Sequence, residues 1–190
     1  KDADRDIQNT WFNWDFLWAE YSTTTSSGTS TITSPSDLAQ WNIDSVVYDP
    51  TAENWQPLEF VPWKNYREDY KYGTVDSAVP EVFSIKPSNV MDLYPTPDAS
   101  TTLTAEYWQT PTDLSANDSV SVIPVRYHRI IICRAKMFYA EQNDAAEVMA
   151  GSASEFNDLL LKLEADQLPG QRNRRFSLVQ NLKDYTVVPE

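Results

Sequence analysis

Apolar and polar positions divide the chain into a helical start, a β-rich middle and a helical end. Across residues 4–21, Ile7, Trp11, Trp14 and Trp18 recur at helical spacing, which predicts a helix with an aromatic stripe. We expect the stripe to pack in the core; the alternative is a surface that stacks on sugars or faces lipid.

The middle of the chain alternates apolar and polar residues in steps of two, most clearly around Leu103, Ala105 and Tyr107. With turn chemistry such as Lys86-Pro87-Ser88-Asn89 between them, such segments predict strands. The predicted strands are Thr29–Thr33, Ser45–Tyr48, Gln56–Val61, Val82–Ile85, Val90–Leu93 and Thr101–Gln109. We expect the last three to form an antiparallel meander, and Pro62–Tyr72 to form a short helix.

The last third returns to helical spacing. A long helix is predicted from Pro124 to about residue 142, since proline is tolerated in a first helical turn. A second helical pattern covers Asn143–Ala153, and a further amphipathic face runs from Phe156 to Leu163 and ends at Pro169-Gly170.

The predicted fold class is therefore α+β: a helical bundle, built from the N-terminal helix and the C-terminal helices, with an inserted antiparallel β subdomain and an extended C-terminal arm. We assign residues 1–21 and 113–169 to the helical domain, 22–112 to the inserted β-rich subdomain and 170–190 to the arm.

The predicted arm combines a basic cluster with apolar residues and lacks strong helical periodicity. It carries 4 bases and 2 acids, in a chain with a net charge of −13. We expect it to become ordered against a protein partner, with nucleic acid as the alternative. Its candidate docking residues are Arg172, Arg174, Arg175, Phe176, Leu178, Val179 and Tyr185.

Composition argues against several function classes. The acidic body opposes binding to nucleic acid by phosphate neutralisation, which needs clustered Lys and Arg. A single cysteine and a single histidine exclude an intrachain disulfide and nearly exclude a Cys/His zinc site. With 4 glycines the chain has no phosphate-binding glycine loop, which excludes a P-loop or a dinucleotide fingerprint. No apolar run approaches the ~20 residues that span a bilayer, so no membrane partner is expected.

No catalytic site is expected. His128 begins the predicted central helix and lacks a recognisable nucleophile, so a structural or interface role is favoured. Cys133 lies among isoleucines, as a small core residue would. Pairs of acids (Asp2/Asp4/Asp6, Glu68/Asp69 and Asp113/Asp118) are expected by chance among 28 acids and are interpreted as surface.

An ordered series of segments resembles the head-to-tail adaptor (head completion, connector) proteins of tailed bacteriophages, over roughly residues 6–165. The segments are Asp6-Ile7-Gln8, Trp14-Asp15-Phe16-Leu17, Pro35-Ser36-Asp37-Leu38, Leu93-Tyr94-Pro95-Thr96-Pro97-Asp98, Leu103–Trp108, Pro111, Leu114-Ser115, Asp118, Ile123-Pro124-Val125-Arg126-Tyr127-His128 and the helix Ile130–Tyr139.

The resemblance implies a structural virion protein without enzymatic activity and without a cofactor. It implies a homo-oligomeric ring, usually of twelve copies, at the head–tail junction, bound to the portal protein and docking a tail or nozzle protein. Viral DNA would pass through its channel without sequence-specific binding, and the acidic charge would keep the DNA backbone from sticking. The alternatives are a carbohydrate-binding protein and another tail or baseplate component.

Overall fold

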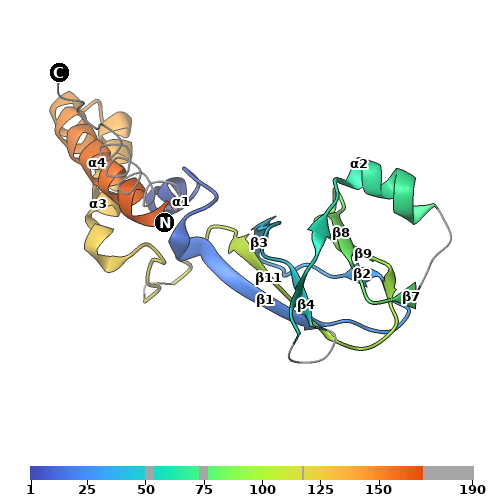
Figure 1. Cartoon of the computed structure of the whole chain (residues 1–190). Coiled ribbons are helices and arrows are strands. Elements are labelled where there is room, and N and C mark those ends of the chain that lie inside the picture. Colours follow the sequence, from blue (N-terminus) through green and yellow to red (C-terminus); the bar gives the residue numbers. More distant parts are fainter. Residues whose placement is uncertain (50–53, 73–76, 117, 169–190) are drawn as a thin grey trace, which may run out of the picture. The chain divides into compact units, whose positions relative to one another are not determined.

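The computed structural model describes residues 1–49, 54–72, 77–116 and 118–168, and Figure 1 shows their elements. They combine four helices with mainly antiparallel sheets, which confirms the α+β class. They form two compact units: a helical unit of Lys1–Leu17 and the chain from Pro111 onward, and a β unit of Trp18–Thr110.

The larger sheet of the β unit is organised around β11 (Thr102–Gln109). Along one edge β11 pairs antiparallel with all of β1 (Trp18–Thr24). Its other edge is divided between β3 (Leu38–Trp41) and β4 (Val47–Asp49), and β5 (Gln56–Pro57) continues the sheet beyond β4. One strand thus holds together segments that lie far apart in the sequence.

A second sheet is formed by β2 (Thr31–Ile32), β9 (Met91–Tyr94), β8 (Val82–Ile85) and β6 (Glu59–Phe60), in that order. Only β6 pairs in parallel, with β8. Two short strands, β7 (Ser77–Ala78) and β10 (Thr96–Pro97), pair with each other in parallel.

The expected meander of three strands is half right. β8 and β9 are antiparallel neighbours, joined by the predicted turn, in which Asn89 takes a positive φ of 62°. β11, however, belongs to the other sheet. Alternation along a strand fixes which residues face the core, but it does not select the neighbouring strand.

The core of the β unit takes side chains from both sheets. On β11, the alternating residues Leu103, Ala105 and Tyr107 are all buried. The buried cluster comprises Ile32, Trp41, Val46, Tyr48, Leu58, Phe83, Met91, Leu93, Leu103, Ala105 and Tyr107.

The prediction of one helix over residues 4–21 is wrong after the second turn. Helix α1 spans Asp2–Gln8, η1 (Asp15–Leu17) is a single 3₁₀ turn, and the chain then enters β1. Trp18 to Thr24 contains aromatic and β-branched residues that suit a strand, and β11 offers them a complete edge. Pairing with a distant strand therefore overrides the local helical spacing.

The remaining helices follow the prediction more closely. Helix α2 (Trp63–Tyr66) continues into η2 (Arg67–Lys71), a short π-helical segment, so the predicted Pro62–Tyr72 helix is confirmed. The predicted central helix becomes a 3₁₀ turn, η3 (Val125–Tyr127), followed by α3 (Arg129–Gln142).

In the helical unit, α4 (Ala146–Gln167) unites the two helical patterns that the sequence shows after residue 142. α1 packs against α3, and α3 packs along α4. Ile130, Cys133 and Ala140 of α3 are buried, as the apolar spacing of that helix predicts. Arg134 of α3 joins the contact with α1, since its Nε donates a hydrogen bond of 2.5 Å to Asp6 Oδ2.

Candidate functional site

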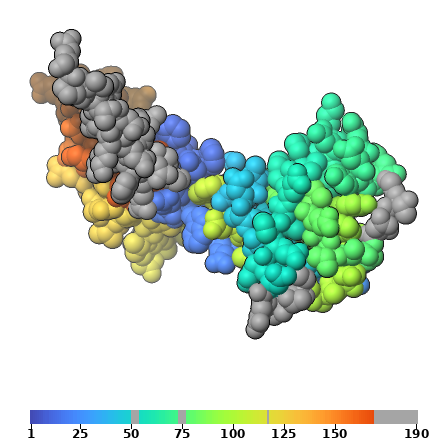
Figure 2. All heavy atoms as spheres, in the orientation of Figure 1, coloured from blue at the N-terminus to red at the C-terminus, as the bar shows by residue number. Residues whose placement is uncertain are grey.

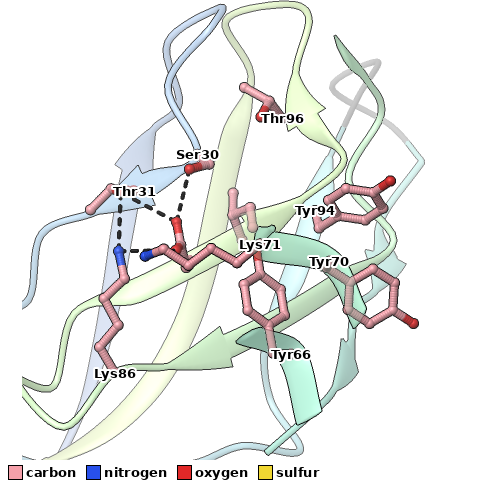
Figure 3. Close-up of a pocket in the computed structure, with 10 residues that line it drawn as sticks. Ser30, Thr31, Tyr66, Tyr70, Lys71, Lys86, Tyr94 and Thr96 are labelled. Carbon is pink, nitrogen blue, oxygen red and sulfur yellow. Dashed lines mark hydrogen bonds and ion pairs between the residues drawn. The ribbon is translucent and has the colours of Figure 1, made fainter. Parts of the chain in front are cut away.

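A polar pocket of about 240 Å³ opens in the β unit beside α2 (Figure 3). It is lined by Ser30, Thr31, Tyr66, Tyr70, Lys71, Lys86, Asp92, Leu93, Tyr94 and Thr96. These residues come from the approach to β2, from the α2–η2 segment, from the β8–β9 turn and from β9 to β10. The pocket is therefore assembled by the tertiary fold.

The centre of the pocket is the buried carboxylate of Asp92, whose side chain is only 6% exposed. Lys86 Nζ lies 3.0 Å from Asp92 Oδ2, and Lys71 Nζ lies 3.8 Å from the same oxygen. The hydroxyls of Ser30 and Thr31 donate to Asp92 Oδ1 at 2.8 and 3.3 Å. Figure 3 shows these groups converging. Two cations meet one anion here, so the pocket keeps a net positive charge.

A row of aromatic rings forms one side of this site. The ring centroids of Trp63 and Tyr66 lie 5.7 Å apart, those of Tyr66 and Tyr70 5.6 Å, and those of Tyr70 and Tyr94 4.8 Å. Lys71 Nζ lies 4.8 Å from the Trp63 ring centroid, a cation–π contact. Burial, and then the negative charge of Asp92, raises the pKa of Tyr66, so its hydroxyl stays protonated and can donate a hydrogen bond.

All the basic residues in the sequence of the β unit belong to this neighbourhood. Residues 18–110 contain 13 acids and only 4 bases, namely Lys64, Arg67, Lys71 and Lys86. The first three lie on the α2–η2 segment, which Figure 2 shows (green) on the surface of the β unit. We call these four bases and the aromatic row the basic patch. The α2–η2 segment also carries Glu68 and Asp69, so its bases exceed its acids by one, whereas acids dominate the sequence of the rest of the unit.

The outer face of the β1–β11 pair has the opposite character. Trp18 lies opposite Trp108, and Glu20 lies opposite Glu106. Side chains directly opposite on one face of a sheet are close neighbours, so two carboxylates in this register repel each other. We call this face, with Trp18, Glu20, Glu106 and Trp108, the acidic strip.

The two single-copy residues weighed as catalytic candidates both have structural surroundings. His128 Nε2 is hydrogen-bonded to the carbonyl oxygen of Ile123 at 2.8 Å, which ties η3 to the preceding loop. Cys133 is buried, and burial raises the pKa of its thiol, with a further contribution from Glu155. A buried, protonated thiol is a poor nucleophile.

We expect Cys133 to react slowly with iodoacetamide at pH 8 in the folded protein. Its alkylation rate should be at least about tenfold lower than that of the same thiol in urea-unfolded chain, because both exclusion of the reagent and the raised pKa reduce attack. Mass spectrometry of timed samples measures both rates. Equal rates in the two states would contradict the described packing of α3.

Two of the acids singled out in the sequence are engaged within the fold, and one of them, Asp4, is buried, where the sequence was interpreted as surface. Asp4 is buried and accepts hydrogen bonds from Gln8 Nε2 (2.7 Å) and Ser121 Oγ (2.5 Å). Asp113 forms an ion pair with Arg5, and the hydrogen bond from that guanidinium lowers the pKa of the carboxyl. These carboxylates hold α1 to the loop after Pro111 and are engaged within the fold.

A family model described as SU10 adaptor protein matches residues 1–179. The chain belongs to the SU10 adaptor protein family. It is therefore a structural protein of the bacteriophage virion, an adaptor that associates with other virion proteins. The resemblance seen in the sequence is confirmed at this level. A search of curated proteins finds no match.

The sequence-predicted docking residues of the adaptor lie outside the described residues: Arg172, Arg174, Arg175, Phe176, Leu178, Val179 and Tyr185. Within the described residues, no three or more His, Cys, Asp or Glu side chains gather as a metal site would require. In the same part of the chain, no helix has the length and apolar character to cross a bilayer.

Sequence reasoning missed the basic patch of the adaptor. Two signals could have found it. Asp92 is a lone acid between Met91 and Leu93 in an apolar strand, and a buried carboxylate needs a cationic or hydrogen-bonding partner. The four bases of residues 18–110 are also confined to a stretch of 23 positions, from Lys64 to Lys86.

Proposed function

We propose that this adaptor assembles into a closed ring, of twelve copies, at the head–tail junction of the virion. One side of the ring binds the portal protein and the other docks a tail or nozzle protein. The ring extends the channel through which viral DNA passes. The observation that carries the proposal is the family match over residues 1–179.

The charge of the chain supports a channel that does not retain DNA. A net charge of −13 repels phosphates, so the DNA can move past the adaptor without adhering to it. The few bases of the β unit are gathered in one patch beside α2, and they do not offset that repulsion over the rest of the unit.

Within this proposal, the predicted division of the chain assigns a task to each part. The helical unit, with Lys1–Leu17 and the chain from Pro111, forms a bundle domain, the β unit of Trp18–Thr110 forms an insertion in it, and residues 170–190 form an arm. The arm binds the portal protein or a neighbouring copy and gains its affinity by ordering on assembly.

The number of adaptor copies per portal ring tests the proposed ring. We expect native mass spectrometry of portal complexes purified from particles to show twelve adaptor copies per portal ring. Quantitative proteomics of whole particles should give the same ratio of adaptor to portal protein. An adaptor that is absent from portal complexes, or present in another part of the particle, would contradict the proposal and favour a tail or baseplate role.

A further inference from the structure

We propose that the basic patch of one adaptor copy binds the acidic strip of the next copy, so that the β units form the repeating contact of the ring. In this contact Lys71 and its exposed neighbour Arg67 meet Glu20 and Glu106 of a second copy. The inference rests on the proposed ring and names the surfaces that join its subunits.

The β unit carries two different surfaces, as a ring contact requires. A closed ring of identical copies with more than two members needs head-to-tail contacts, in which two different surfaces of the same chain complement each other. The β unit has two such surfaces. Figure 1 shows α2, which carries the basic patch, well separated from the β1–β11 pair, which carries the acidic strip. Each copy can therefore use both surfaces at once.

Both surfaces carry charges that lack a partner of opposite charge within the described part of one copy. Among the described residues, neither Glu20 nor Glu106 has a cationic partner, and the Glu106 carboxylate accepts a hydrogen bond of 2.9 Å from the neutral Asn42 Nδ2. Lys64 and Arg67 likewise have no carboxylate partner in the described part of the chain. A head-to-tail contact would pair these opposite charges, which the described part of each copy leaves unpaired. It would also reduce the repulsion between the carboxylates of Glu20 and Glu106.

The pocket offers groups that can bind a carboxylate. Lys71 and Lys86 share a single carboxylate, Asp92, so one cation can still pair with an incoming carboxylate. The protonated Tyr66 hydroxyl can donate to such a group. Trp18 lies on the same face of β1 as Glu20, and its side chain is 45% exposed. It offers an aromatic surface to the row of aromatic rings in the basic patch.

DNA is the competing partner for a basic and aromatic surface. The second copy is favoured because acids accompany the cations of the patch: Glu68 and Asp69 follow Arg67 on η2, and Asp92 lies inside the pocket itself. Asp92 repels the continuous phosphate backbone of DNA. The pocket still leaves room for one or two carboxylate side chains.

The test is a charge-reversal exchange in the full-length adaptor, supplied in trans to phage that lack it and scored as copies incorporated per particle. We expect Arg67→Glu and Glu20→Lys, made singly, each to lower incorporation by about tenfold or more, since like charges then face each other across the contact. The double variant Arg67→Glu/Glu20→Lys restores opposite charges and should return incorporation to within about threefold of wild type.

Controls separate this contact from general effects of charge and folding. Asp98→Lys, in the turn before β11, and Lys162→Glu, on α4, make the same charge changes outside both surfaces and should leave incorporation unchanged. Lys71→Glu should reproduce the effect of Arg67→Glu, and circular dichroism of each purified variant checks that the chain is folded. Arg67 is the primary site because it lies outside the Asp92 ion pairs.

The outcomes distinguish this inference from the ring itself. Single variants that incorporate normally, or a double variant that is not rescued, would overturn the contact while the ring stands. Binding of fluorescent duplex DNA that is lost in Arg67→Glu would overturn it in favour of DNA. Absence of the wild-type adaptor from the head–tail junction would instead overturn the proposed function.

Discussion

Replacing Lys86 with methionine is expected to destabilise the β unit by about 2 kcal/mol. The change leaves the buried Asp92 carboxylate with one distant cation, Lys71 at 3.8 Å, and two hydroxyl donors. Removing one partner of a buried ion pair costs about 3–5 kcal/mol, and the 20% exposure of the Lys86 side chain reduces that cost. Hydrogen exchange of the β8 and β9 amides measures the local free energy of opening.

Two further variants identify the cause of this loss. Lys86→Met combined with Asp92→Asn removes both charges while keeping the side-chain volume, and we expect it to recover most of the stability. Lys162→Met, an exposed lysine on α4, should change stability by less than about 0.5 kcal/mol. If Lys86→Met alone were equally mild, the carboxylate of Asp92 would not depend on Lys86 as described.

Removing residues 170–190 is expected to leave the rest of the adaptor folded and to block its incorporation into particles. The described core and ion pairs lie entirely within residues 1–168, so the truncated chain keeps the contacts that stabilise each unit. The deleted segment carries the basic cluster and the apolar residues that the sequence predicts to dock on a partner. Copies per particle, counted by quantitative mass spectrometry, measure the effect.

A milder variant separates the basic cluster from the length of the arm. Full-length adaptor with Arg172, Arg174 and Arg175 replaced by alanine should incorporate less than wild type and more than the truncation, because the apolar residues remain. Unchanged circular dichroism shows that folding is intact. Normal incorporation of the truncated chain would contradict the docking role of the arm.

The sequence predicted best the elements whose stability is local. Helix α3 and the β8–β9 hairpin appear where periodicity and turn residues place them, because apolar spacing and proline or asparagine turns act within a few residues. Strand β11 was predicted for the same reason, from the alternation that its burial pattern shows.

The failures come from partners that are distant in sequence. Trp11, Trp14 and Trp18 share helical spacing, yet only Trp14 is buried, because Trp18 belongs to a strand paired with residues 102–108. The pocket around Asp92 unites segments 62 residues apart, from Ser30 to Asp92, and no local pattern encodes such a meeting. Pairing of this kind depends on the complete fold.

Cryo-electron microscopy of the intact particle tests the central claim most directly. We expect a twelve-copy ring of this chain between the portal and the next tail component, with the acidic body lining or surrounding the DNA path. Residues 170–190 should contact the portal or an adjacent copy. Density for this chain at the baseplate, along the tail tube or on the capsid surface, with none at the portal, would contradict it.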